Sequence, residues 1–339
     1  MISDKIIFIV GNSRSGTTMM LRIFNNHDRL MVLNELHFFE ELWSPNDKGK
    51  MIPRDEAIFL VQKLLLIQRK GYKVGFDDFS IFYDEAKVIL NDFSDEQLIP
   101  ENIYYHFAKR EVELNGKSVV CEKTPQNVFY LKEIFDIFPN ARIINMVRDP
   151  RGVMLSQKNK WNRRKLGGWY ITKKEARRLR INYHPITLTK LWNAAVNAVK
   201  KFEEDKRILT VIFEELVNQP EQQIRKICEH IEEPFEQEML MITQESSSVE
   251  PDSQEKGFKK ERVANWQKGG LNNTEIWFCE QIGKQNIEHF RFKLSGIQPN
   301  YLLVLFYIIS FPVKLILSFM LNLDRMRNIT ETLKRRLLN

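Results

Sequence analysis

Cysteine is scarce in this sequence. Cys121, Cys228 and Cys279 are the three among 339 residues, and they are far apart. No Cys-x-x-Cys spacing marks a metal or redox site, and three distant cysteines give no disulfide framework. We expect buried thiols in a reducing compartment. The six histidines are scattered, so we also expect no metal site.

A secretory leader is also missing from the start of this sequence. The apolar stretch 6–10 has only five residues and runs directly into a glycine-containing loop. A signal peptide needs a longer apolar core and a small-residue cleavage site. We therefore interpret 6–10 as a buried strand and expect a cytoplasmic protein whose folded domain begins here.

What the sequence does have is a large apolar content and an excess of positive charge. Apolar residues make up 43% of the chain, enough for one large or two modest domains. The formal net charge is +7, which favours anionic partners such as a nucleotide, a polyanion, nucleic acid or a membrane surface. The mean hydropathy of -0.37 is that of a soluble protein, so an apolar stretch near the C-terminus stands out.

Strand and helix patterns alternate along the chain. Short apolar runs predict strands at 6–10, 118–121, 142–147 and 207–213. Helical periodicity follows each of them, and residues 37–115 resemble a helical insertion. Such alternation predicts a parallel sheet covered by helices on both faces, with ligands at the carboxyl ends of the strands.

A loop between the first strand and the first helix has the spacing of a phosphate-binding loop. Backbone amides and the helix N-terminus in such a loop bind anions. Thr17 stands where nucleotide P-loops carry lysine, and a kinase or ATPase needs that lysine on the γ-phosphate. The alternative is a Gly/Ser-rich turn without a ligand. The predicted binding residues are Gly11, Asn12, Ser13, Arg14, Ser15, Gly16, Thr17 and Thr18.

The fold class predicted from these patterns is α/β. We expect a P-loop NTPase-like parallel sheet flanked by helices, with helical insertions and a C-terminal apolar helical tail. The predicted division is a domain at 1–298 and an apolar and basic tail at 299–339.

Several motifs resemble those of sulfotransferases that use 3′-phosphoadenosine 5′-phosphosulfate (PAPS). Arg-Ser-Gly-Thr-Thr at 14–18 is similar to the 5′-phosphosulfate loop of tyrosylprotein and bacterial members. Asn-Glu-Leu-His-Phe-Phe-Glu at 34–40 and Glu-Lys-Thr-Pro at 122–125 are similar to stretches of heparan sulfate 3-O-sulfotransferases. Arg-Asp-Pro at 148–150, followed by Ser156, resembles the 3′-phosphate motif, and 213–217 resembles a further family stretch.

The resemblance extends over residues 5–295, with gaps and departures. Residues 41–115 and 157–200 match nothing specific. Val32 replaces a disulfide cysteine of the tyrosylprotein enzymes, and Lys160 replaces an arginine near the 3′-phosphate motif.

The resemblance implies a role for each motif residue. Arg14, the loop amides, Thr17 and Thr18 would hold the 5′-phosphosulfate, and Arg148 with Ser156 the 3′-phosphate. Lys123 would neutralise the leaving group. PAPS, with 3′-phosphoadenosine 5′-phosphate (PAP) as product, would be the only cofactor, without a metal.

Two residues are candidates for the base that accepts the acceptor's proton. The resemblance points to Glu35, and a carboxylate among cations stays ionised at neutral pH. His37 is the rival, because cytosolic sulfotransferases use a histidine. On an extended segment both side chains face one side.

Three further features allow two interpretations each. Glu40 is either a helix N-terminal acid or an acceptor contact. Trp266 lies either beside the nucleotide or in the core. Residues 157–180 hold ten lysines and arginines, one acid and three interleaved aromatic side chains; they form either a solvated basic surface or a groove for an anionic or carbohydrate acceptor.

The apolar stretch 301–321 is so long that we expect protein or lipid to cover it, and Pro312 and Lys314 interrupt it. We expect Pro312 to divide it into two short helices. With the basic residues up to 336, it suits a peripheral, cytoplasmic-face membrane contact. The alternatives are a packing or dimerisation helix pair and a transmembrane span.

The sequence thus predicts a PAPS-dependent O-sulfotransferase, with a saccharide or glycolipid as acceptor. A peptide tyrosine is the alternative acceptor. A non-catalytic or kinase-like nucleotide-binding protein is the alternative class. Nucleic acid is not expected as a partner, since no recognition motif accompanies the basic residues, and the oligomeric state is left open.

Overall fold

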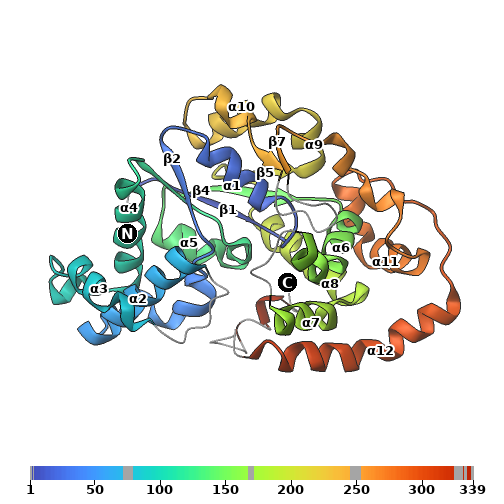
Figure 1. Cartoon of the computed structure of the whole chain (residues 1–339), viewed down its shortest axis with the longest axis horizontal. Coiled ribbons are helices and arrows are strands. Elements are labelled where there is room, and N and C mark those ends of the chain that lie inside the picture. The colour runs from blue at the N-terminus through green and yellow to red at the C-terminus, as the bar shows by residue number, and fades with distance from the viewer. Residues whose placement is uncertain are drawn as a thin grey trace.

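A five-stranded parallel sheet forms the centre of the computed structural model (Figure 1). The structure describes residues 2, 4–71, 79–166, 172–244, 253–323, 331 and 334–336. The strand order is β2-β3-β1-β4-β5, and a separate antiparallel pair joins β6 to β7. The strands are β1 Ile6–Gly11, β2 Leu30–Leu33, β3 Val119–Glu122, β4 Arg142–Val147, β5 Ile208–Ile212, β6 Thr243–Gln244 and β7 Ser253–Lys256.

Helices cover both faces of the sheet (Figure 1). Their bounds are α1 Thr17–Asn25, α2 Arg54–Lys70, α3 Tyr83–Ile89, α4 Pro100–Leu114, α5 Leu131–Ile137, α6 Pro150–Lys158, α7 Lys173–Asn182, α8 Pro185–Lys200, α9 Phe213–Asn218, α10 Pro220–Ile231, α11 Asn273–His289 and α12 Tyr301–Met320. Short turns of other helix types lie between them, including η1 Phe38–Leu42 and η6 Pro125–Tyr130.

The central strand is apolar throughout because both of its faces are buried. Ile6, Phe8 and Val10 pack into a core formed with the helices of the insertion. Ile7 and Ile9 point the other way, into a core shared with α1 and α10. A parallel sheet between two helical layers requires such continuous apolar strands. The predicted fold class is confirmed.

The four predicted strands are present, and β2 was missed. Its four residues follow α1 after a short turn, and a run this short carries little periodic signal. The helical pattern expected after the strand at 118–121 is not α-helical throughout. A 3₁₀ segment occupies 125–130 before α5 begins at Leu131.

The expectation that Pro312 divides the tail into two helices was wrong. α12 runs unbroken through Pro312 and is 20 residues long. Proline removes one backbone donor, but this loss does not end the helix. By length and composition alone α12 is able to cross a membrane, with a mean hydropathy of 2.3. It lies along one edge of the molecule, beside α7 (Figure 1).

Candidate active site

The carboxyl ends of the five strands bring most of the predicted site residues into one row. Leu33 of β2 pairs with Glu122 of β3, so Glu35 and Lys123 lie just beyond neighbouring strand ends. Gly11 of β1 pairs with Met146 of β4, which places the phosphate loop beside Arg148. The sheet order therefore arranges acid, lysine, loop and arginine in sequence along one edge.

The phosphate loop takes its shape from glycines at its two ends. Gly11 has φ of +136°, and a Cβ there would lie 2.3 Å from the carbonyl oxygen of Met146. Gly16 has φ of +103°, and its Cβ would lie 2.7 Å from the Phe213 ring. Left-handed backbone and this close approach require glycine at both positions. The loop then opens α1 at Thr17, where the helix N-terminus favours an anion.

Arg148 is held beside this loop by Phe213, the first residue of α9, and by α6. Its guanidinium lies 4.3 Å above the Phe213 ring and donates to the carbonyl oxygens of Arg14 and Arg262 at 3.4 and 3.3 Å. A Cβ at residue 152 would be 3.1 Å from its Nε, so Gly152 allows α6 to approach the guanidinium. Burial lowers the pKa of Arg148, although Glu214 opposes that shift.

Two buried polar atoms at the loop have no hydrogen-bond partner in the described part of the chain. They are the Nε of Arg148 and the Oγ of Ser15. Buried donors are nearly always paired, so an anion that accepts from both sites fits this edge of the sheet. These orphaned donors are the observation on which the fit of a phosphate-bearing donor rests.

Arg14 lies closer to the 3′-phosphate motif than its predicted role requires. It adopts left-handed backbone with φ of +75°, and its Nε donates to Ser156 Oγ at 2.8 Å. Arg14, Arg148 and Ser156 therefore form one cluster. The predicted division, with Arg14 on the 5′ side and the other two on the 3′ side, stays a prediction.

Glu35 and Lys123 form an ion pair, with Nζ 2.5 Å from Oε1. Burial raises the pKa of Glu35, but Lys123 and a hydrogen bond from His37 outweigh burial, and the net pKa lies well below the ordinary value. The Lys123 side chain is buried, while that of Glu35 remains 37% exposed. The carboxylate is thus ionised, partly accessible, and paired with the Lys123 ammonium.

His37 lies beside the same carboxylate, in surroundings that favour the protonated ring. Its Nε2 is 3.6 Å from Glu35 and its Nδ1 is 3.4 Å from Glu40. Burial lowers the pKa of His37, but the hydrogen bonds with the two glutamates overcome this and raise it to about 9. A protonated imidazole cannot accept a proton, so the geometry favours Glu35 over His37 as base.

Sequence reasoning missed the role of Glu122, the residue before Lys123. Glu122 is buried and accepts from the Thr124 hydroxyl at 2.5 Å and from Asn127 Nδ2 at 2.6 Å. Burial raises the pKa of Glu122 to about 7, against the hydrogen bonds from Thr124. The Thr124 Oγ1 also accepts from the His37 amide at 3.3 Å. This network links the ends of β3, η6 and η1. The Glu-Lys-Thr-Pro stretch is the sequence pattern that could have revealed it.

A contact from the C-terminus was also missed. Arg336 forms an ion pair with Glu40, and Arg335 pairs with Glu133 at 2.5 Å and stacks on Tyr130. Glu40 is buried and touches His37, so the tail reaches the acceptor side of the site. The ligand atoms of His37, Glu40 and Glu41 lie within 4.8 Å of one another, a spacing that suits a cation, and here a guanidinium pairs with Glu40.

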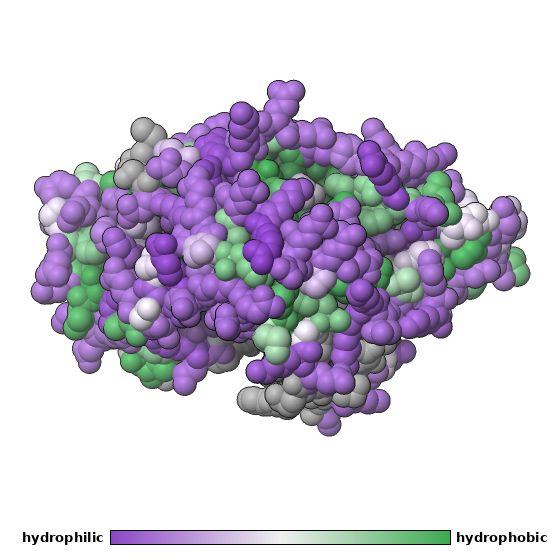
Figure 2. Space-filling model, turned by 90° about the horizontal axis from the view of Figure 1, so that it is seen from above, coloured by the Kyte–Doolittle hydropathy of each residue, from purple (hydrophilic) through white to green (hydrophobic). Residues whose placement is uncertain are grey.

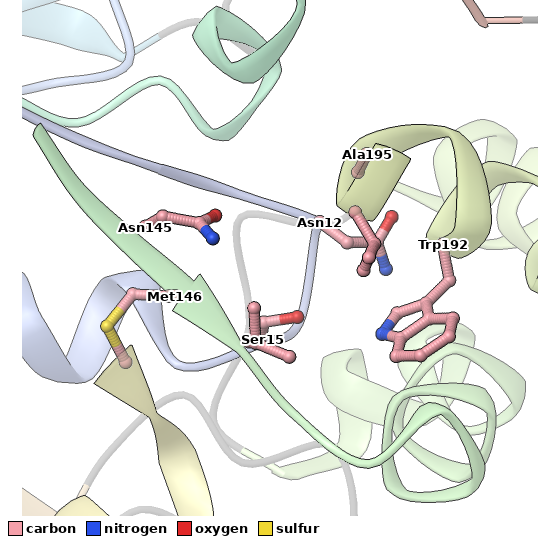
Figure 3. Close-up of a pocket in the computed structure, with 8 residues that line it drawn as sticks. Asn12, Ser15, Asn145, Met146, Trp192 and Ala195 are labelled. Atoms are coloured by element: carbon pink, nitrogen blue, oxygen red, sulfur yellow. The ribbon is translucent and has the colours of Figure 1, made fainter. Parts of the chain in front are cut away.

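A small cavity lies behind the loop (Figure 3). Asn12 and Ser15 of the loop, Asn145 and Met146 of β4, and Trp192 of α8 line it. Its volume of about 10 Å³ has room for about one water molecule. The Trp192 Nε1 donates to the Arg148 carbonyl oxygen at 3.1 Å, so α8 supports Arg148 from behind.

Trp266 lies in a packed cluster. Trp266 is buried against Leu155 and stacks on the Arg151 guanidinium at 3.9 Å. Asp149 pairs with Arg151 at 2.7 Å rather than with Arg148.

The basic segment 157–180 is only partly described. Trp161 lies 5.6 Å from the Arg180 guanidinium. Trp169 and Tyr170 lie outside the described residues, so the predicted groove remains a prediction.

The sulfotransferase family profile matches residues 7–237. This range is most of the chain and contains the phosphate loop, Glu35, Lys123 and Arg148. The chain belongs to the sulfotransferase family.

Relatives of known sequence include Protein-tyrosine sulfotransferase A from Caenorhabditis elegans. It is 32% identical over 248 residues, which cover 70% of this chain and 52% of that protein. An uncharacterized protein from Aquifex aeolicus is 24% identical over 292 residues, covering 84% of this chain and 33% of the relative. The chain thus spans about half the length of the first relative and a third of the second.

Among solved structures, the sulfotransferase domain from the curacin biosynthetic pathway superimposes with a TM-score of 0.50. It is 18% identical and covers 84% of this chain and 98% of that domain. This likeness shows a shared fold.

Proposed function

We propose that this sulfotransferase moves a sulfonate group from PAPS onto an acceptor hydroxyl. The observation that carries the proposal is the row at the strand ends, where Glu35, Lys123, the phosphate loop and Arg148 follow one another. The loop suits a 5′-phosphosulfate, and Arg148 with Ser156 suits a second phosphate. Three cationic groups beside a phosphate loop favour a donor with two anionic ends.

In the proposed reaction, the acceptor oxygen forms a bond to sulfur while the bond between sulfur and the bridging oxygen breaks. The bonding electron pair stays on the 5′-phosphate, and the acceptor proton goes to Glu35. Positioning and electrostatic stabilisation supply most of the rate. Lys123 is suited to neutralise the leaving phosphate.

The Lys123–Glu35 pair implies that the donor binds before Glu35 becomes an effective base. A carboxylate held by a lysine is a weak base, because the ammonium stabilises its charged form. An anionic donor competes for Lys123, and drawing the ammonium toward the phosphate raises the proton affinity of Glu35. The base is therefore activated when the donor is bound.

For the acceptor we propose a saccharide or glycolipid. The support is the similarity of 34–40 and 122–125 to heparan sulfate 3-O-sulfotransferase stretches, together with the basic surface after α6. A peptide tyrosine is the second candidate, favoured by the 32% identity to the tyrosine enzyme of Caenorhabditis elegans. A cytoplasmic location remains our proposal, and the three buried free thiols are compatible with it.

Turnover of ³⁵S-labelled PAPS against a panel of glycans, glycolipids and tyrosine peptides tests this proposal. We expect label transfer to a hydroxyl-bearing saccharide and none in a Glu35→Gln variant. Transfer to tyrosine peptides alone would select the second candidate. If the wild-type protein does not bind PAPS, the assignment of PAPS as the donor is wrong.

A further inference from the structure

The polar side of α12 faces the rest of the protein and its apolar side faces outward, which is the reverse of an ordinary surface helix. Its half-buried positions include Tyr307, Ser310, Lys314 and Ser318, which recur every three or four residues and so share one side. Large apolar side chains occupy the outer side and are exposed. They include Leu302, Leu305, Ile309, Val313, Ile316 and Met320, with exposed fractions from 56% to 80%.

Polar contacts hold the inner side of α12 against the catalytic domain. The Tyr307 hydroxyl donates to Glu275 at 3.3 Å and accepts from Asn272 at 3.2 Å. Ser310 lies 3.4 Å from His184 of α8. These contacts reach the N-terminal ends of α11 and α8, and they fix the side of α12 that faces the domain.

The contacts continue just past the C-terminal end of the helix. Asn322 accepts from Arg178 of α7 and donates to Asn182 at 3.3 Å. α12 is therefore attached along most of its length. It lies flat on the domain and does not leave it.

The neighbouring surface carries positive charge. α7 runs beside α12 (Figure 1), and its exposed side chains include Lys173, Lys174, Arg177 and Arg180. Its one acid, Glu175, is paired with Arg178. An apolar face next to a row of cations is the pattern of a helix that lies in the interface of an anionic membrane.

The opposite side of the molecule has a different character. Figure 2 shows the face away from α12, over α9 and α10, and hydrophilic residues cover most of it. The side of the molecule along α12 is thus distinguished from this face by its exposed apolar row.

We propose that α12 binds an anionic lipid surface in the plane of the membrane, with its outer apolar side in the head-group region and α7 over the lipid charges. Twenty residues at a rise of about 1.5 Å span about 30 Å, so length alone would also allow a crossing. A crossing would take Tyr307, Ser310 and Asn322 away from their partners and place them in hydrocarbon, where unpaired polar groups are costly. A second copy of the chain, docked on the same side, would bring the cations of α7 against like charges.

Vesicle flotation of the full chain tests the lipid contact. We expect flotation with phosphatidylcholine vesicles that contain phosphatidylserine, and weaker flotation without phosphatidylserine or at high salt. The double variant Ile309→Glu with Ile316→Glu should lose about tenfold or more in binding, because it places charge on the apolar side. The matched control is Ile81→Glu with Val88→Glu, equally exposed positions on the insertion, which should float like wild type.

Thiol labelling tests the in-plane orientation. The native cysteines are buried, so Gln298→Cys and Leu323→Cys report on the two ends of α12 separately. When protein is added to preformed vesicles, a membrane-impermeant maleimide should label both. Protection of one end would overturn the proposal in favour of a span. A full chain that does not float would also overturn the proposal. Light scattering then distinguishes a monomer from a dimer, and a dimer that the double variant dissociates would show that α12 joins two copies of the chain.

Discussion

Three charged side chains set the chemistry of the acceptor side. Lys123 and His37 both contact Glu35, so the carboxylate is ionised and its basicity is suppressed until one cation moves. The raised pKa of His37, about 9, makes this residue an electrostatic partner at neutral pH. These contacts support the prediction that Glu35, and not His37, is the base.

Replacing Glu35 with glutamine separates proton transfer from donor binding. The amide keeps the size of the side chain and accepts no proton, so turnover should fall by about 10²–10⁴-fold. PAP affinity should change little, because Glu35 is predicted to serve the acceptor. Initial rates and calorimetry measure the two effects, with His37→Gln as the comparison. Full loss of turnover in His37→Gln, with Glu35→Gln active, would reverse the roles.

The folding free energy contributed by His37 should depend on pH. Its folded pKa of about 9 lies above the unfolded value of 6.5. The native state therefore holds its proton more tightly, and the stabilisation is complete below pH 6.5 and lost as pH rises through 9. The loss is on the order of 3–4 kcal/mol, from a difference of about 2.5 pKa units at about 1.4 kcal/mol per unit. The difference in unfolding free energy between wild type and His37→Gln should shrink from pH 7 to pH 10. An unchanged difference over that range would show that the ring is neutral in the folded protein.

At the scale of elements, β1 and the turn after it determine where the anion site forms. A Cβ at Gly11 would meet a backbone carbonyl at 2.3 Å, which no side-chain movement relieves. Gly116 also has positive φ, at +69°, with nothing within 4 Å of its Cβ position. The two positions share a left-handed backbone and differ in their surroundings.

We expect Gly116→Ala to lower stability by about 1–2 kcal/mol, the cost of left-handed backbone. Gly11→Ala should lower it by more than about 3 kcal/mol and weaken PAP binding, because the strand end must shift. Thermal unfolding and calorimetry of the two variants measure this contrast. Equal destabilisation would show that the loop relaxes freely and that its shape does not depend on close packing.

The elements that sequence predicted best are those with the longest patterns. β1 and β4 are clear apolar runs and were found nearly to the residue. β2 was missed because four apolar residues give no period, although this strand carries Glu35 to the site. The unbroken α12 was missed because a proline rule is local, whereas contacts with α7, α8 and α11 support the whole helix.

Local sequence patterns also limited what could be predicted of the site. The motif spacing predicted that Glu35, Lys123 and the loop belong to one site, since parallel strands share a carboxyl edge. It did not predict that Arg336 pairs with Glu40, because a contact across 296 residues leaves no local signal. Nor did it predict that Arg14 bonds to Ser156, which depends on the left-handed backbone at Arg14.

At the scale of the whole molecule, the described part of the tail contacts the rest of the chain at several places. The division near residue 298, between the sheet with its helices and α12, stays a prediction. Tyr307 and Ser310 contact the domain at α11 and α8. Arg336 contacts it at Glu40.

A chain that ends at Pro299 should therefore remain folded and bind PAP with an affinity within about a factor of two of the full chain, since polar surface contacts contribute about 0.5–1.5 kcal/mol each. Without Arg336, Glu40 loses a charge partner and its pKa should rise. Circular dichroism melting and calorimetry check the fold and the affinity. Loss of a cooperative transition would mean that the tail is a structural part of the domain.

The central claim concerns the donor, and calorimetric titration without Mg²⁺ tests it most directly. We predict that PAP binds more tightly than AMP by about 10- to 100-fold, as a charge-assisted contact of about 1.5–3 kcal/mol to the 3′-phosphate requires. Arg148→Ala should remove most of that difference, whereas Arg225→Ala, an exposed arginine on α10, should leave it intact. Equal affinity of the wild-type protein for PAP and AMP would contradict the assignment of this site to PAPS.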